Sequence, residues 1–157
     1  MPVKEAPIQI KEIQFSTSAH ATEDIQKVRE ALLNLLPEHL REKVEIKDTL
    51  ITGHAGNEIH LLELKVSQKK AVKEILTYLG EQLNEYDTEK LGEEFEARID
   101  QANCFYLRLN KQAAYTGQLV VDDSDNAIRL MIKFIIYKPN PTLIPKTLAA
   151  FGIIKKD

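Results

Sequence analysis

The chain has 157 residues, of which 43% are hydrophobic and 29% are charged, and its formal net charge is −3. This length and composition indicate one globular domain over residues 1–157, and they exclude a collagen-like, low-complexity or disordered chain. No apolar run reaches the roughly 18–20 residues that cross a bilayer. The first five residues contain no hydrophobic signal region, so we expect a cytoplasmic protein with no membrane partner.

The charges are distributed unevenly along the chain. Residues 85–100 contain seven acidic and two basic residues, whereas residues 101–121 contain two bases and no acid. Residues 127–157 contain six bases and one acid, and only the Asp-rich segment 122–126 separates the two basic stretches. Because a polyanion responds to the local potential and not to the total charge, nucleic acid stays among the expected partners.

The first half of the chain predicts a strand, a helix and a hairpin. Residues 8–19 have an extended pattern that changes phase in its first half, as a β-bulge would cause. A helix is expected over residues 22–37, with Thr22 as its N-cap. Two alternating segments, 44–51 and 58–66, are joined by a turn that contains glycine and asparagine, which is typical of a hairpin.

The second half predicts helices followed by strands. In chain order we expect a helix from Ser67 to Leu83, an acidic surface helix from Asp87 or Thr88 to Ile99, strands over 104–109, 118–121 and 127–137, and a short helix within 144–154. Strands grouped in hairpins with helices between them predict an α+β fold. Its sheet is expected to be largely antiparallel, with helices packed on one face.

Few residues have the spacing of a catalytic or metal site. His54, Glu58 and His60 could ligate a metal, but they do not form the His-Glu-x-x-His helix pattern, and exposed hairpins commonly carry such residues. Cys104 is the single cysteine, so an intrachain disulfide and a zinc finger are excluded. The segment 122–126 lacks the EF-hand spacing and is expected to be a solvated turn. We therefore expect no enzyme activity, no metal and no cofactor.

The late strands indicate a binding surface instead. If their apolar residues face the helices, the opposite face presents Tyr106 and Arg108 from one strand and Arg129 and Lys133 from the other. Cations and flat rings on one sheet face suit phosphates and bases. The alternative is the ordinary polar face that any antiparallel sheet needs.

The segment that follows residue 109 adds further candidates. A helical turn at residues 110–112 would direct free backbone N–H groups and the Lys111 ammonium toward an anion. Gln112 could hydrogen-bond a sugar or a base edge, and Tyr115 could stack on a base or close the core. A connection that is stabilised by its own side chains is the competing interpretation.

The run LRLNKQAAYTG at residues 107–117, followed by an acidic turn and AIRLMIKF at residues 127–134, resembles a known family. Its members are small archaeal proteins predicted to bind RNA and once proposed as exosome-associated subunits. The resemblance extends over most of residues 8–137 and implies an α+β fold similar to that of the ribosomal protein that binds five-S RNA. It also implies RNA binding without catalysis, and an association with RNA processing.

Together these observations predict a noncatalytic RNA-binding protein. The residues expected to contact RNA are Arg108, Lys111, Gln112, Tyr115, Arg129 and Lys133. The expected partners are RNA, an RNA-processing complex and a second copy of the chain. The alternative is a protein-interaction or homodimerisation module that binds no nucleic acid and buries Tyr106, Met131 and Ile135 against its partner.

Overall fold

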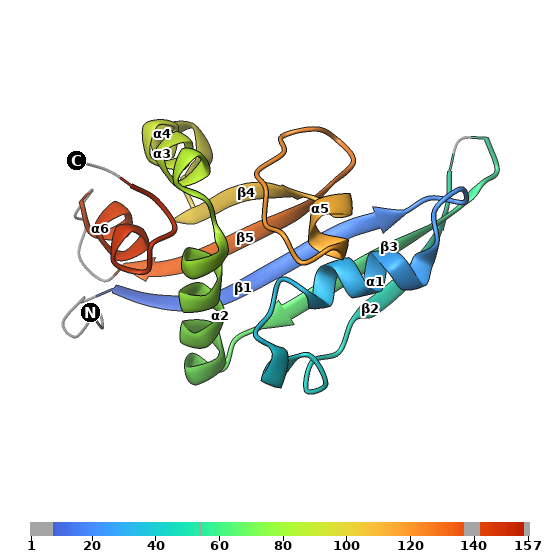
Figure 1. Cartoon of the computed structure of the whole chain (residues 1–157), viewed down its shortest axis with the longest axis horizontal. Coiled ribbons are helices and arrows are strands. Elements are labelled where there is room, and N and C mark those ends of the chain that lie inside the picture. Colours follow the sequence, from blue (N-terminus) through green and yellow to red (C-terminus); the bar gives the residue numbers. More distant parts are fainter. Residues whose placement is uncertain (1–7, 54, 137–141, 156–157) are drawn as a thin grey trace.

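The computed structural model describes residues 8–53, 55–136 and 142–155, and Figure 1 shows the arrangement of their helices and strands. In chain order the elements are β1 (Ile8–Ala19), α1 (Ile25–Leu33), η1 (Glu38–Leu40), β2 (Lys47–Thr52), β3 (Glu58–Val66), α2 (Lys69–Gln82), α3 (Glu85–Glu93), α4 (Phe95–Arg98), β4 (Cys104–Asn110), α5 (Lys111–Tyr115), β5 (Ala127–Ile136) and α6 (Leu143–Ala150). None of the described helices is both long enough and apolar enough to span a bilayer.

The strands form one antiparallel sheet in the order β2-β3-β1-β5-β4. The first strand therefore lies at the centre, between β3 and the last strand, β5. The predicted bulge in β1 is confirmed, because its pairing with β5 shifts register between Ile10 and Glu12. The strand alternation sets which side chains share a face of this sheet.

Helices cover one face of the sheet, as predicted (Figure 1). The covered face is lined by apolar residues that alternate along each strand, and Phe15, Phe105, Leu107 and Leu130 are 0–2% exposed. Phe95 of α4 stacks on Phe105 with 5.8 Å between the ring centroids. The predicted α+β fold class is confirmed, and the core lies between the helices and this face.

The residues at the N-cap positions of α1, α2 and α3 differ from the expected ones. Asp24, and not Thr22, caps α1, because its carboxylate accepts the Gln26 N–H at 3.0 Å. Gln68, and not Ser67, precedes the first residue of α2, without a side-chain cap bond. Asn84 caps α3 by accepting the Asp87 N–H at 2.8 Å. In each case the expected cap and the actual one are polar residues within three positions of each other, so the sequence offers two candidates for the N-cap.

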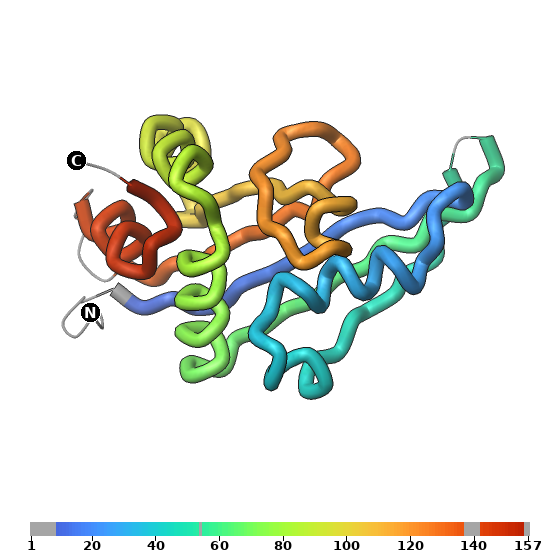
Figure 2. Tube along the Cα trace, in the orientation of Figure 1, coloured from blue at the N-terminus to red at the C-terminus, as the bar shows by residue number. Residues whose placement is uncertain are grey.

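Two of the predicted elements changed. The acidic helix is divided at Glu94 into α3 and α4, and it buries Leu91 completely, so it is more than a surface helix. The predicted strand over 118–121 is a single bridge between Val121 and Leu109. It lies in a long connection from α5 to β5, which Figure 2 shows as a loop beside β4 and β5. Tyr137, expected to end the last strand, lies outside the described residues.

The C-terminal segment packs directly on the backbones of two helices. A Cβ atom at Gly80 of α2 would lie 1.8 Å from the Phe151 carbonyl oxygen, and one at Gly92 of α3 would lie 2.1 Å from the Lys155 carbonyl oxygen. Only glycine allows such an approach at either position. The segment after α6 is therefore part of the core packing.

The opposite end of the molecule is less covered. The β2–β3 hairpin and the end of β1 extend past α1 (Figure 2). Every residue of β2 is exposed, and Leu50 and Ile51 are 55% and 44% exposed. Because β2 is an edge strand, its outer backbone groups have no strand partner among the described residues.

Candidate nucleic-acid interface

The face of the sheet opposite the core carries the cations of the late strands. In the register of the sheet, Arg108 of β4 lies opposite Arg129 of β5, and Arg129 lies opposite Ser16 of β1. Lys133 is two positions further along the same face of β5. The structure thus brings Arg108, Arg129 and Lys133 onto one surface, which we call the open face. The alternation of buried residues in the sequence was sufficient to predict this placement.

The two arginines form a like-charged pair across neighbouring strands. Such a pair destabilises a sheet unless opposite charge compensates it. The Arg108 guanidinium lies 3.8 Å from the exposed Asp125 carboxylate and donates a long bond to the Ser124 carbonyl oxygen. The Arg129 guanidinium lies 4.6 Å from the centroid of the Tyr106 ring and makes no ion pair within the described ranges. Among the residues that the structure describes, the Arg129 guanidinium therefore has no carboxylate partner.

A cavity of about 370 Å³ opens beside this pair. It lies on the open face, where β1 extends past the start of β5. Its lining includes Ser16, Ser18, His20, Arg108, Asn126 and Arg129. Cations, hydroxyls, an amide and the carboxylate of Asp125 thus surround a space of the size that small ligands occupy. We call it the arginine pocket.

Two aspartates of the nearby acidic loop, Asp122 and Asp123, have partners outside the arginine pair. The Arg98 guanidinium contacts the Asp123 carboxylate at 2.9 Å, and the Lys90 ammonium contacts it at 3.4 Å. The Arg98 hydrogen bond outweighs burial and lowers the pKa of Asp123. The Ser124 N–H and the Asn110 amide lower the pKa of Asp122 in the same way. Among the described residues, neither carboxylate forms an ion pair with Arg108 or Arg129.

Tyr106 is fixed on the open face. Its hydroxyl donates to the Asp100 carboxylate at 3.0 Å, and burial, followed by this bond, raises the pKa of the phenol. The half-buried ring lies under the Arg129 guanidinium. A fixed aromatic ring with a cation over it is a stacking platform for a flat base.

Lys111 is placed differently from the expectation. The predicted helical turn is present as α5, and the Asn110 side chain caps it by accepting the Ala113 N–H. The Lys111 side chain, however, is only 8% exposed, and its ammonium points into the protein. It donates to the Ser18 carbonyl oxygen, to the Glu23 carboxylate at 3.1 Å and to the Asn126 side-chain oxygen at 2.6 Å. In this position the ammonium cannot reach a phosphate.

The sequence contained a signal for this burial. Phe105, Leu107 and Leu109 occupy the buried positions of β4, and Lys111 continues the same alternation. Partial burial opposes the ionisation of Glu23, but hydrogen bonds from the His20 N–H and from Lys111 outweigh it, so the pKa of Glu23 is lowered. The carboxylate and the ammonium stabilise each other as a pair. We call these contacts of Lys111 the lysine clasp.

Gln112 and Tyr115 lie neither on the open face nor in the protein interior. They line a groove of about 340 Å³ between α1 and α5, on the helix-covered side of the sheet. Tyr115 is 39% exposed, and the Lys27 ammonium lies 5.7 Å from its ring centroid. The six predicted contact residues are thus divided among the open face, the protein interior and the α1–α5 groove.

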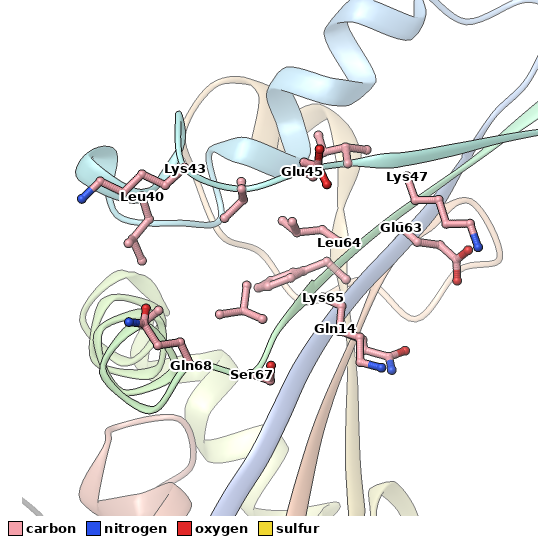
Figure 3. A pocket seen from close by; sticks show the side chains of 15 residues that line it. Gln14, Leu40, Lys43, Glu45, Lys47, Glu63, Leu64, Lys65, Ser67 and Gln68 are labelled. Carbon is pink, nitrogen blue, oxygen red and sulfur yellow. The ribbon is translucent and has the colours of Figure 1, made fainter.

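The cavity in Figure 3, of about 1040 Å³, lies at the edge of the sheet, beyond the first residue of β2. Its charged lining residues have both signs and are Lys43, Glu45, Lys47, Glu63 and Lys65. Lys47 and Glu63 are directly paired in the sheet, and the Lys65 ammonium lies 3.6 Å from the Glu12 carboxylate. This cavity therefore offers a polyanion less uncompensated charge than the arginine pocket does.

Residues considered for other chemistry have structural partners. The His60 imidazole hydrogen-bonds the Asp48 carboxylate at 2.8 Å, and His54 lies outside the described residues. Within the described ranges, no three His, Cys, Asp or Glu side chains are grouped so that they could hold a metal ion. Cys104 is 4% exposed, and burial, together with Asp100, raises the pKa of its thiol. A reactive thiolate is therefore disfavoured at this position.

Comparison with known proteins gives a consistent result. A family model described as RNA binding matches residues 12–134. An RNA-binding protein from Pyrococcus abyssi is 34% identical over 127 residues, which cover 80% of this chain and 82% of that protein. An uncharacterized protein from Methanocaldococcus jannaschii is 34% identical over 133 residues, covering 83% and 88% of the two chains.

Solved structures share the fold. A DUF54-family protein from Archaeglobus fulgidus superimposes with a TM-score of 0.79 at 27% identity, covering 91% of this chain and 99% of that chain. A DUF54 protein from Methanothermobacter thermautotrophicus gives a TM-score of 0.73 at 26% identity, covering 90% and 97%. The α+β arrangement is therefore common to these proteins.

Proposed function

Because the chain belongs to the RNA-binding family, we propose that it binds RNA, without catalysing a reaction, through the open face of the sheet. The observation that carries the proposal is the Arg108–Arg129 pair. The two arginines occupy directly paired positions of β4 and β5, both line the same cavity, and Arg129 has no carboxylate partner within the described residues. A phosphate would supply the missing negative charge.

We assign the residues of the open face to separate roles. Arg108, Arg129 and Lys133 neutralise phosphates, and Tyr106 together with Arg129 stacks against a base. Lys111 supports the interface from inside, since it holds Ser18 and Asn126, which line the arginine pocket. Gln112 and Tyr115 can contact only RNA that continues around the molecule to the α1–α5 groove.

Salt dependence tests the proposal. With about three phosphate contacts, the log–log slope of affinity against salt should be near −2 to −3. Fluorescence anisotropy with a labelled RNA oligonucleotide, titrated from low to moderate salt, measures it. An affinity that does not change with salt would contradict a phosphate-based interface.

Two finer expectations belong to this proposal. An association with an RNA-processing assembly follows from the family resemblance and not from the geometry. The family resemblance also implies a fold similar to that of the ribosomal protein that binds five-S RNA, so a folded RNA is a suitable first ligand. Co-purification from cells, with and without ribonuclease, separates a protein partner from one that is bridged by RNA.

An interaction with a second copy of the chain is the other candidate, and one observation favours it. Leu50 and Ile51 are the most exposed large aliphatic side chains among the described residues, and they lie on the open edge of β2. An edge strand of this kind can pair with another strand. Sedimentation at several protein concentrations, with and without RNA, distinguishes a dimer from a monomer that binds RNA.

A further inference from the structure

We propose that the arginine pocket holds one phosphate and the adjoining ribose of an RNA strand, so that the protein distinguishes RNA from DNA at this position. The inference rests on the proposed function, because it assigns a chemical group to the same open face. It adds a preference that charge alone would not give, since RNA and DNA have the same phosphate charge.

The arginines form the phosphate end of the pocket. Arg108 and Arg129 occupy directly paired positions, so one anion can contact both guanidiniums. Arginine presents its N–H groups in a planar fork that matches phosphate oxygens. Binding there would also reduce the repulsion between the two cations, for which the sole carboxylate partner among the described residues is Asp125, 3.8 Å from Arg108.

The opposite wall offers groups suited to a sugar. The Asn126 side-chain oxygen accepts from Lys111 at 2.6 Å, so the amide N–H groups of Asn126 are left as donors without a partner among the described residues. The hydroxyls of Ser16 and Ser18 also line the cavity and make no hydrogen bond within the described ranges. A hydroxyl can both donate and accept, as the ribose 2′-hydroxyl does.

Asp125 makes the pocket selective. An ionised carboxylate only accepts hydrogen bonds, and beside a bound phosphate it is repulsive unless it faces a donor. Asp125 lines the cavity and is fully exposed, and within the described part of the chain the contact of its carboxylate with Arg108 is its single ion pair. The ribose 2′-hydroxyl is a donor that DNA lacks, and carboxylates are known to bind it. Asp125 should therefore favour RNA and disfavour DNA.

The dimensions agree with a single nucleotide unit. The cavity volume of about 370 Å³ is near the low end of the range for small-ligand pockets. It is lined by residues of β1, β3, β4 and β5 and of the loop before β5. Its volume is suited to one phosphate and the adjoining sugar.

Three oligonucleotides of one sequence test the inference: RNA, DNA and 2′-O-methyl RNA, each labelled for fluorescence anisotropy. We expect RNA to bind about tenfold more tightly than DNA, the effect of one hydrogen bond to a charged group. The 2′-O-methyl RNA should bind like DNA, because it keeps the RNA sugar geometry but cannot donate. Equal affinity for RNA and DNA, or for RNA and 2′-O-methyl RNA, would overturn the inference.

The variant Asp125→Ala tests whether this carboxylate causes the preference for RNA over DNA. In this variant the RNA-to-DNA ratio should fall to near one, with DNA bound as well as before or better. Glu63→Ala is the matched control, because it removes a carboxylate from the same face but outside the arginine pocket. It should change the RNA and DNA affinities by the same factor. An unchanged ratio in Asp125→Ala contradicts the role assigned to that carboxylate.

The two proposals fail in different ways. If RNA and DNA bind equally and both depend on Arg129, the open face binds nucleic acid but the arginine pocket does not distinguish ribose from deoxyribose. If neither binds, the proposed function itself fails. Thermal unfolding of each variant confirms that the fold is intact before affinities are compared.

Discussion

Arg108 and Lys111 are three positions apart in the chain, yet the arginine pocket and the lysine clasp use their cations in opposite ways. In the clasp, one ammonium has three partners and is buried. In the pocket, two arginines occupy directly paired strand positions, and among the described residues only Arg108 has a carboxylate partner, Asp125 at 3.8 Å. The comparison teaches that the number of basic residues in a segment does not define a polyanion site. The charge that remains unpaired after folding does.

The largest effect should come from Lys111→Met. It leaves the Glu23 carboxylate and the Ser18 carbonyl oxygen without their partner, which we expect to destabilise the fold by about 3 kcal/mol. Chemical denaturation measures the loss. A variant as stable as the original protein would show that the clasp contributes little, and the contrast between the two regions would disappear.

Arg129→Glu should weaken RNA binding strongly and leave the stability of the fold almost unchanged, the reverse of the effect of Lys111→Met. It removes one like charge from the pair, so the fold should keep its stability within about 1 kcal/mol. RNA affinity should fall about tenfold or more, and the salt slope should decrease in magnitude by about one. Lys70→Glu, the same charge change on the exposed side of α2, is the control and should leave binding almost unchanged. Equal losses in both variants would mean that only net charge matters.

Glu23→Gln gives a smaller, pH-dependent effect. The pKa of Glu23 is lowered in the folded protein, so the carboxylate stabilises the fold above its unfolded pKa, and this stabilisation is lost as the pH falls through the folded pKa. The variant should therefore be less stable at pH 7 and should approach the original protein below pH values of about 4. Thermal unfolding at several pH values measures the difference, which should not grow on acidification.

The smallest effects are expected in the α1–α5 groove. Gln112→Ala and Tyr115→Ala should weaken the binding of a short RNA less than twofold, because the groove lies on the other side of the sheet from the arginines. A longer RNA that reaches both sides should show a larger loss. If the short RNA depends on Tyr115 as strongly as on Arg129, the interface has been assigned to the wrong face.

Strand alternation allowed the sequence to predict the sheet face of Arg108, Arg129 and Lys133, because period-two burial is a local property of each strand. The same alternation extended to Lys111 would have predicted its burial. Nothing local indicated its partners, since Glu23 lies 88 positions away in the chain. Likewise, the Asp-rich turn is exposed at residues 123–126, as expected, but the binding of its Asp123 by Arg98 and Lys90 of two helices had no local signal. Long-range pairing of charges requires the fold.

The pairing of the first strand with the last also affects how the chain folds. Thr17 of β1 donates its hydroxyl hydrogen bond to the carbonyl of Ala127, 110 positions later, and β1 is the central strand. During synthesis, the edge of β1 that pairs with β5 therefore stays unpaired until almost the whole chain has emerged from the ribosome. Contacts so distant in sequence slow folding and prolong the exposure of unpaired strand edges. A nascent chain of this protein should consequently need protection from aggregation until β5 is complete.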